Sequence, residues 1–184
     1  MLLRHLPAAA RRSTPWKNGG GVTQEIAAWP PGAGLDAFDW RISTARVESD
    51  GPFSWFDGVD RVLTILEGAL ELRLGNGAPT ILTDLSEPFA FPGDAPCSGA
   101  PLGGAVVDLN VMVRRGSLRA RVSRLLEPAP ILAAGDVLIV LTLAPTTLNG
   151  LSLERHDAVQ TGRGEAIQVD GPWPGLIVIE LYEA

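Results

Sequence analysis

Apolar and polar residues alternate in short stretches along the whole chain. In Phe38–Ala45, every second residue from Trp40 faces one side of an extended strand, and every second residue from Arg41 faces the other. No stretch of about twelve residues or more keeps its apolar side chains at the spacing of an α-helix. The pattern therefore predicts an all-β protein with few short helices.

Further strands are predicted where alternation, or a continuous apolar run, lies between turns rich in glycine, proline or asparagine. They cover Val59–Leu66, Ala69–Leu74, Ile81–Thr83, Phe89–Phe91, Val106–Val113, Leu118–Leu125, Val137–Leu143, Glu165–Val169 and Gly175–Leu181. Gly75–Gly77 and Asn149–Gly150 supply residues that tolerate the positive φ angles of tight hairpins. Short strands in this number predict a β-sandwich or a β-barrel.

The longest break in the pattern is Leu126–Asp136, which contains two prolines and a glycine. We interpret residues 126–136 as a connecting segment. It would join a larger N-terminal β region, residues 1–125, to a smaller C-terminal β region, residues 137–184. We expect the second region to pack on the first, so that the chain forms one compact unit.

Composition narrows the classes of function. The 184 residues are 46% hydrophobic and 20% charged, which excludes a disordered chain. A formal charge of -6 disfavours nucleic acid and anionic membranes as partners, because both bind basic surfaces. The single cysteine, Cys97, forms no internal disulfide, and the first residues lack the apolar run of a signal peptide. We therefore expect a cytoplasmic protein.

Six segments, in order along the chain, resemble the HutD/Ves family, whose members are bicupin proteins often encoded with bacterial histidine-utilisation genes. The segments are Trp16–Ile26 (WKNGGGVTQEI), Phe38–Ser43 (FDWRIS), Ser49–Ser54 (SDGPFS), Arg61–Gly68 (RVLTILEG), Phe89–Asp94 (FAFPGD) and Asp108–Arg115 (DLNVMVRR). The resemblance implies double-stranded β-helix (cupin) barrels in a bicupin arrangement. It also implies a role in limiting or sensing histidine breakdown, through binding of an intermediate such as formylglutamate or urocanate.

Metal-dependent cupins resemble one another in two motifs that this chain does not keep. Their two first-motif histidines, their glutamate and their second-motif histidine fall on or near Trp55, Asp57, Arg61 and Cys97. The two histidines of the chain, His5 and His156, lie outside both motifs. Because a metal site of this kind needs two or three imidazoles and a carboxylate, we predict no metal and no other cofactor.

We predict instead that polar residues at interior-facing positions and in a glycine-rich turn bind a ligand. These residues are Trp16, Lys17, Asn18, Arg41, Ser43, Arg61, Asp108 and Asn110. In the turn, the glycines after Asn18 can expose N–H groups as an anion nest, beside the charge of Lys17. The alternative is a structural turn that Trp16 caps. No residue is assigned a catalytic role.

Arg61 replaces a metal-binding carboxylate, which changes the preference of the pocket from cations to anions. Its planar guanidinium suits a carboxylate ligand, and the alternative is an ion pair with Asp57 or Asp60. Arg41 and Ser43 share a strand face, and a buried arginine there needs a carboxylate from a ligand or from the protein.

Glu25 and Asp108 are the candidate internal partners of Arg41. Asp108 and Asn110 also lie on one face of an apolar strand, which indicates either a pocket wall or a buried hydrogen-bonded network. Outside this set, we interpret Arg114 and Arg115 as solvated charges at a strand end. We interpret His156 and Asp157 as surface residues.

The resulting hypothesis is a metal-free cupin that binds or senses a small acidic or planar metabolite and is not an enzyme. One alternative is a metal-independent isomerase or epimerase with Asp108 or Glu25 as its base. Another is a protein-interaction module with a vestigial pocket. Because edge strands readily pair, a homodimer is one expected assembly.

Overall fold

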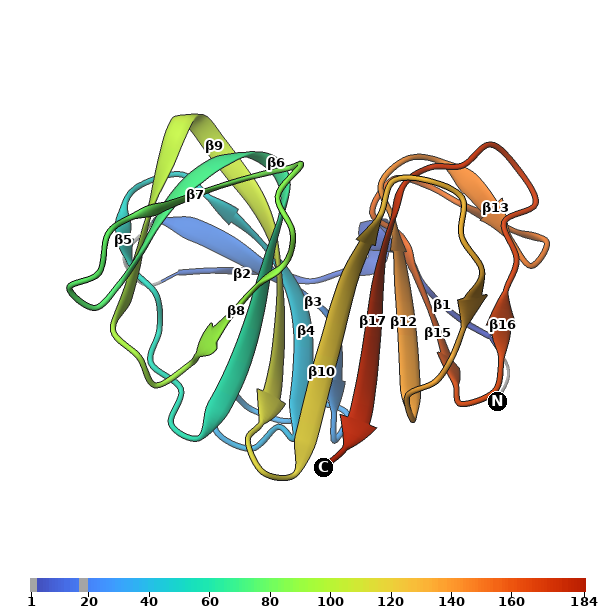
Figure 1. Ribbon diagram of the computed structural model, residues 1–184, viewed down its shortest axis with the longest axis horizontal. Coiled ribbons are helices and arrows are strands. Elements are labelled where there is room, and N and C mark those ends of the chain that lie inside the picture. Colours follow the sequence, from blue (N-terminus) through green and yellow to red (C-terminus); the bar gives the residue numbers. More distant parts are fainter. Residues whose placement is uncertain (1–2, 17–19) are drawn as a thin grey trace. The chain divides into compact units, whose positions relative to one another are not determined.

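The computed structural model describes residues 3–16 and 20–184, and nearly all regular structure in them is antiparallel β-sheet (Figure 1). The only helix in this part of the chain is a 3-10 turn, η1 (Ala8–Ala10). The predicted all-β fold with few short helices is confirmed. Within the described ranges, no helix has the length and apolar character needed to cross a membrane.

The chain divides into two compact units. The middle unit is Arg12–Ser117, and the terminal unit combines the residues up to Arg11 with Leu118–Ala184. The sequence suggested a division at residue 125, whereas the structure places it after residue 117. The reason is that β10 (Leu118–Leu125) pairs along its whole length with β17 (Leu176–Glu183), so its hydrogen bonds belong to the terminal unit.

A curved eight-stranded sheet forms the middle unit (Figure 1). Its strands are β2 (Ser13–Pro15), β3 (Gly21–Trp29), β4 (Trp40–Val47), β5 (Gly51–Pro52), β6 (Val59–Leu74), β7 (Thr80–Thr83), β8 (Phe89–Pro92) and β9 (Cys97–Arg114). The order across the sheet is β2-β3-β4-β9-β6-β7, with β5 paired to β9 and β8 paired to β6. The two long strands β9 and β6 therefore lie side by side between β4 and β7.

β6 is one strand where the sequence predicted two. Its ladder with β9 changes register between Ile65 and Ala69, and Gly68 has a φ of 85°. A side chain at Gly68 would be strained at this φ, and its Cβ would lie 3.2 Å from the carbonyl oxygen of Ala105. The glycine thus forms a bulge inside a continuous strand.

The terminal unit has a five-stranded sheet in the order β1-β15-β12-β17-β10 and two small two-stranded sheets, β11-β16 and β13-β14. In addition to β10 and β17, its strands are β1 (Arg4–Leu6), β11 (Ile131–Leu132), β12 (Val137–Thr142), β13 (Thr146–Leu148), β14 (Leu151–Leu153), β15 (Ala158–Gly162) and β16 (Ala166–Ile167). The proline-containing segment after residue 125 leads into β11, so it lies inside this unit and does not connect two domains.

The cores of the two units are built from different residues. The buried cluster of the middle unit contains Leu63, Ile65, Leu70, Leu72, Leu82, Phe91 and Val106. The buried cluster of the terminal unit contains Ile131, Ala133, Leu138, Val140, Leu148, Leu153, Val159, Ile167, Leu176 and Val178. Each unit therefore has its own apolar core, as expected of a separate folding unit.

Asp157 ties the N-terminal segment to the rest of the terminal unit. The residue is 4% exposed, and its carboxylate accepts hydrogen bonds from the backbone N–H groups of Ala8 (2.7 Å) and Glu154 (3.1 Å). His5 Nε2 lies 3.0 Å from Asp157 Oδ2. The interpretation of Asp157 as a surface residue is therefore wrong, because donors 149 and 152 positions away in the sequence surround it.

Candidate functional site

The predicted strand residues of the site share one face of the middle sheet. Paired residues of neighbouring antiparallel strands project to the same side, so the register shows which side chains meet. Across β4, β9 and β6, the three rows of this face are Arg41, Met112 and Arg61; Ser43, Asn110 and Leu63; and Ala45, Asp108 and Ile65. The structure thus brings together five polar residues that are up to 69 positions apart, from Arg41 to Asn110.

Arg61 lies buried on this face, with 3% of its surface exposed. Its Nη1 donates to the carbonyl oxygen of Ser54 at 3.2 Å, and its Nε makes a long hydrogen bond of 3.4 Å to Asn110 Oδ1. The alternative partner Asp60 instead accepts a hydrogen bond from Arg115. Within the described part of the chain, Arg61 Nη2 has no hydrogen-bond acceptor, and no carboxylate forms an ion pair with Arg61.

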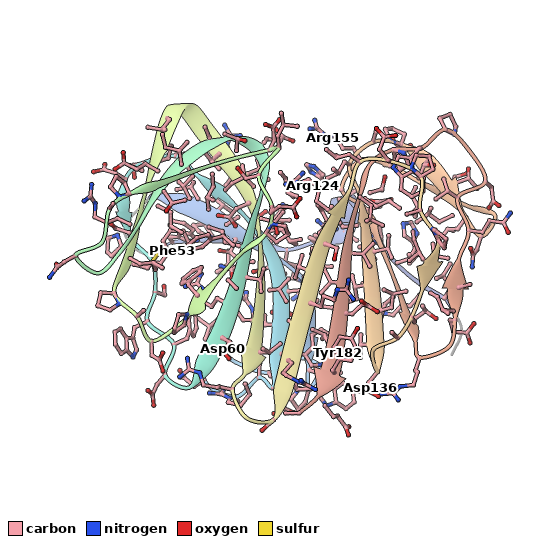
Figure 2. The ribbon with its side chains drawn as sticks, in the orientation of Figure 1. Phe53, Asp60, Arg124, Asp136, Arg155 and Tyr182 are labelled. Carbon is pink, nitrogen blue, oxygen red and sulfur yellow. The ribbon has the colours of Figure 1, made fainter. Side chains whose placement is uncertain are left out.

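Three phenylalanine rings surround the Arg61 guanidinium. Its central carbon lies 5.1 Å from the ring centres of Phe53 and Phe91 and 5.6 Å from that of Phe56. Figure 2 labels Phe53, which lies inside the curve of the middle sheet. Such contacts stabilise a guanidinium through the negative faces of the rings, although they do not neutralise its charge. Trp55, from the same aromatic segment, is instead 60% exposed.

Asp108 is a further ionisable group on this face and is 1% exposed. Its Oδ1 has no hydrogen-bond partner among the described residues. Burial raises the pKa of Asp108 to about 7, while Arg61 and a backbone hydrogen bond from Ala45 act in the opposite direction. At neutral pH the carboxyl group is therefore protonated for a large part of the time.

The charge of Arg61 persists under the same conditions. Burial lowers the pKa of Arg61 to about 10, against the opposing influence of Asp108 and Cys97. Burial also raises the pKa of the Cys97 thiol to about 11, against the influence of Arg61. Near neutral pH the interior thus holds a guanidinium cation, a neutral thiol and a carboxyl group close to its midpoint.

Arg41 and Ser43 lie on the same face toward its β3 side. Arg41 Nε donates to Glu25 Oε2 at 2.9 Å, so the structural ion pair weighed in the sequence analysis is present. The Arg41 side chain is 13% exposed and that of Glu25 is 40% exposed. Ser43 is 3% exposed and lies opposite Asn110 in the ladder. The role of both residues in ligand binding stays a prediction.

The glycine-rich turn is described only in part, because Lys17 and Asn18 lie outside the described residues. Trp16 Nε1 donates to Thr23 Oγ1 at 2.8 Å. A Cβ at Gly21 would lie 2.5 Å from the carbonyl oxygen of Arg46 and 3.1 Å from the Trp16 ring. Gly21 therefore allows β3 to approach β4 beneath the tryptophan, which is a structural role for this glycine.

One cluster at the edge of the site was missed from the sequence. Arg115, interpreted as a solvated charge, donates from Nε to Asp60 Oδ1 (2.7 Å) and from Nη1 to Asp94 Oδ2 (2.8 Å). Figure 2 labels Asp60, near the start of β6. Hydrogen bonds from Arg115 and burial act on Asp94 in opposite directions, and the net effect lowers its pKa to about 2. The cluster joins the start of β6 to the loop that precedes Cys97.

Arg114, the other arginine at this strand end, is also held by the protein. Its guanidinium lies 5.5 Å from the Phe38 ring centre, and its Nη1 and Nη2 donate to the carbonyl oxygens of Asp57 and Phe38. Arg115 is exposed and Arg114 is partly exposed at the strand end, but each is also bound by protein groups that the interpretation as solvated charges did not include. The presence of acidic residues at Asp60 and Asp94 could have revealed the partners of Arg115, whereas the backbone carbonyl partners of Arg114 have no sequence signal.

A family model described as HutD matches residues 8–174 of the chain. The chain belongs to the HutD family. A solved structure of HutD from Pseudomonas fluorescens SBW25 matches it with a TM-score of 0.88 and 30% identity, covering 100% of both chains. The predicted family and cupin fold are confirmed.

Two relatives of this HutD-family chain match mainly one part of it. An uncharacterised 21.2 kDa protein in the hutC 3' region of Pseudomonas putida is 43% identical over 107 residues, and Protein Ves of Citrobacter koseri is 42% identical over 108 residues. Each match covers 58% of this chain and 56% of the relative. The chain thus spans about half the length of the curated relatives that it matches.

Two of the four metal-motif positions of this HutD-family chain lie close together. Arg61 and Cys97, which stand at the glutamate and second histidine positions of metal cupins, are close enough to shift each other's pKa. Among the described residues, no group of three or more His, Cys, Asp or Glu side chains could hold a metal ion. The donor set found here suits an anion better than a dication, because a guanidinium repels a metal and attracts a carboxylate.

Proposed function

We propose that the middle unit binds a small metabolite through a carboxylate group that pairs with Arg61. The observation that carries this proposal is a buried guanidinium without a carboxylate partner in the described part of the chain. A buried charge of this kind is costly, and a bound anion would compensate it. The protein would therefore act as a metal-free binding or sensing protein.

The contacts of Arg61 indicate how the ligand would be held. Nε and Nη1 already donate to Asn110 and Ser54, which fixes the plane of the guanidinium. Nη2 has no acceptor among the described residues, so it is the donor that a carboxylate oxygen would use. The rings of Phe53 and Phe91 add apolar contact area beside the charge, which favours a ligand that also has a planar or aliphatic part.

The genetic context of a relative narrows the choice of metabolite. The Pseudomonas putida relative is described as lying in the hutC 3' region, which connects the family with histidine utilisation. We therefore propose an acidic intermediate of histidine breakdown as the ligand, with formylglutamate and urocanate as the first candidates. The unpaired thiol of Cys97 suits a reducing compartment, so we propose that binding takes place in the cytoplasm.

A thermal-shift screen with formylglutamate, urocanate, glutamate and formate tests this function. A ligand at 100 times its Kd adds about 2.7 kcal/mol to the free energy of unfolding, enough to raise Tm by several degrees. Formylglutamate with its carboxylates converted to amides is the control ligand. Shifts for a carboxylate and none for its amide support the proposal, and no shift with any carboxylate contradicts it.

Arg61→Met is the variant that locates the ligand, because it removes the charge and keeps a long apolar side chain among the phenylalanine rings. We expect at least a 100-fold increase in Kd, as for loss of a buried charge-assisted hydrogen bond worth about 3 kcal/mol. The matched control is Arg46→Met, since Arg46 is exposed and paired with Glu48. Unchanged affinity in Arg61→Met would remove Arg61 from the site even if a carboxylate binds.

A second candidate function, proton abstraction from a bound substrate, is favoured by one observation. Asp108 is buried with an unpartnered oxygen, and burial raises its pKa to about 7, as a general base working near neutral pH requires. Incubation of formylglutamate or urocanate in deuterated water, followed by NMR, would reveal exchange or isomerisation. Exchange that is absent from Asp108→Asn would favour this function over simple binding.

A further inference from the structure

Asp108 is set apart from the other polar groups of the site by its unsatisfied oxygen. Asn110 accepts from Arg61, and Arg41 is paired with Glu25, whereas Asp108 Oδ1 has no partner among the described residues. A buried carboxyl oxygen without a partner costs about 1 to 3 kcal/mol. Because most buried polar atoms in proteins are paired, an exception on a proposed binding face indicates that a ligand supplies the partner.

The charges around Asp108 limit what this partner can be. The titratable or charged groups on its face are Arg61 on β6, Arg41 on β4, Glu25 on β3 and Cys97 on β9. Glu25 and Arg41 neutralise each other, and burial keeps the Cys97 thiol protonated near neutral pH. Arg61 is therefore the one cation on this face, within the described residues, that remains for both Asp108 and a ligand carboxylate.

One guanidinium cannot compensate two buried carboxylates. With both ionised, the interior would hold an excess negative charge, and two carboxylates that share a site resolve this conflict by holding a proton. We propose that ligand binding is coupled to protonation of Asp108, which donates a hydrogen bond from Oδ1 to the ligand carboxylate held by Arg61. This inference rests on the proposed function. It adds that the protein binds a proton at Asp108 together with the metabolite.

The proton balance of the step is simple. When Asp108 is ionised in the free protein, binding takes one proton from solvent onto its carboxyl group, and no covalent bond other than this O–H bond forms. When Asp108 is already protonated, binding takes up none. The raised pKa of Asp108, about 7, places the change between these two regimes near neutral pH.

Isothermal titration calorimetry of the full chain with formylglutamate measures this coupling directly. Titrations at pH 5.5 and pH 8, each in two buffers with different heats of ionisation, give the number of protons taken up per ligand. The carboxyl groups of formylglutamate are ionised throughout this range. We expect nearly no uptake at pH 5.5, about one proton at pH 8, and a rise in Kd of up to about tenfold per pH unit above 7.

Asp108→Asn tests the assignment to this residue. The amide carries a permanent N–H donor, so proton uptake and the rise in Kd with pH should both disappear, with tighter binding than the natural protein at pH 8. The matched control is Asp84→Asn, an exposed aspartate in the same unit, which should keep both effects. If Asp108→Asn fails to fold, the paired-buffer titration of the natural protein still decides the inference.

The outcomes separate the two proposals. Tight binding of formylglutamate with no proton uptake at pH 8, or with affinity that increases with pH, overturns the coupling and leaves the proposed function intact. Absence of binding by formylglutamate and every other carboxylate of the screen overturns both. Uptake that persists in Asp108→Asn shows that another group takes the proton and also overturns the inference.

Discussion

Each unit of the protein contains a buried aspartate, and the pKa values of the two are shifted in opposite directions. In the terminal unit, burial acts to raise the pKa of Asp157, but hydrogen bonds from Ala8, Glu154 and His5 outweigh burial and lower it. In the middle unit, burial raises the pKa of Asp108 to about 7, and one of its oxygens has no partner among the described residues. Burial alone therefore does not decide the charge of a carboxyl group. The charge also depends on how many hydrogen-bond donors the fold places next to the carboxyl group.

Both units combine an apolar core with buried polar residues, which in the terminal unit include Asp157 and Glu180. The buried cluster of the terminal unit consists of aliphatic residues such as Leu138, Val140 and Val159. On the interior-facing side of the middle sheet, Arg61, Asp108 and other polar residues interrupt the apolar surface. The proposed site therefore depends on the contacts of Arg61 and Asp108, and not on a difference in how polar the two interiors are.

The largest expected effect comes from removing the satisfied aspartate. Asp157→Ala leaves the Ala8 and Glu154 N–H groups and His5 without their acceptor, and we expect the free energy of unfolding to fall by about 3 kcal/mol. The lowered pKa means that this stabilisation is complete above the ordinary value of 3.8 and is lost as the pH falls below it. Urea denaturation at pH 7 and pH 3 measures both quantities.

The control for this variant is Glu154→Gln, which changes an exposed acid three positions away and should alter stability little. If Asp157→Ala were as stable as this control at pH 7, the hydrogen bonds to the N-terminal segment would contribute nothing to the free energy of unfolding. The satisfied aspartate would then stabilise the protein no more than the unsatisfied one.

Removing the unsatisfied aspartate should have the opposite sign. The natural Asp108 binds a proton more tightly in the folded than in the unfolded state, so stability falls as the pH rises from about 4 to 7. Asp108→Asn removes this penalty, and we expect a gain in the free energy of unfolding at pH 8, of at most about 4 kcal/mol, that shrinks toward zero at pH 4. Denaturation curves at the two pH values, beside those of Asp84→Asn, provide the measurement. A loss of stability at pH 8 would mean that the charge of Asp108 is compensated after all.

The smallest expected effect concerns the close packing of the loop at Gly93 against the Arg61 side chain. A Cβ at Gly93 would lie 2.9 Å from the carbonyl oxygen of Val59 and 3.2 Å from Arg61 Cδ. Gly93→Ala should therefore lower the free energy of unfolding by about 1 kcal/mol and weaken ligand binding by displacing Arg61. Gly34→Ala is the matched control, because a Cβ there meets nothing within 4 Å. Equal behaviour of the two variants would show that the loop around Gly93 adjusts without disturbing Arg61.

Much of the candidate site followed from strand alternation. A period of two is a local property of extended backbone, so the pattern correctly placed Arg41 with Ser43, and Asp108 with Asn110, on single strand faces. The resemblance to metal cupins directed attention to Arg61 and Cys97. The alternative for Arg61, an ion pair with Asp57 or Asp60, is absent among the described residues, because a turn next to a residue in sequence need not be next to its side chain in space.

Other errors had the same origin in long-range contacts. Gly68 correctly signalled an irregularity, but neighbouring β9 continues the ladder past it, so β6 does not end there. Leu118–Leu125 was assigned to the N-terminal region because the longest break in the pattern begins after it, at residue 126, whereas its hydrogen bonds go to β17. Residues 126–136 break the strand pattern as predicted, but this break is not the boundary between the two units.

The sequence by itself determined the strand-rich class of this protein, the faces on which its polar residues lie, its lack of clustered histidines and its family. These properties depend on composition, on the two-residue period of extended chain and on short motifs. Only the tertiary structure decided that β4, β9 and β6 are neighbours, that Arg61 lies among three phenylalanine rings, and that Asp157 has its donors while Asp108 Oδ1 lacks one. The physical reason is that the state of a buried charge depends on the groups that folding brings to it, and those groups are distant in the sequence.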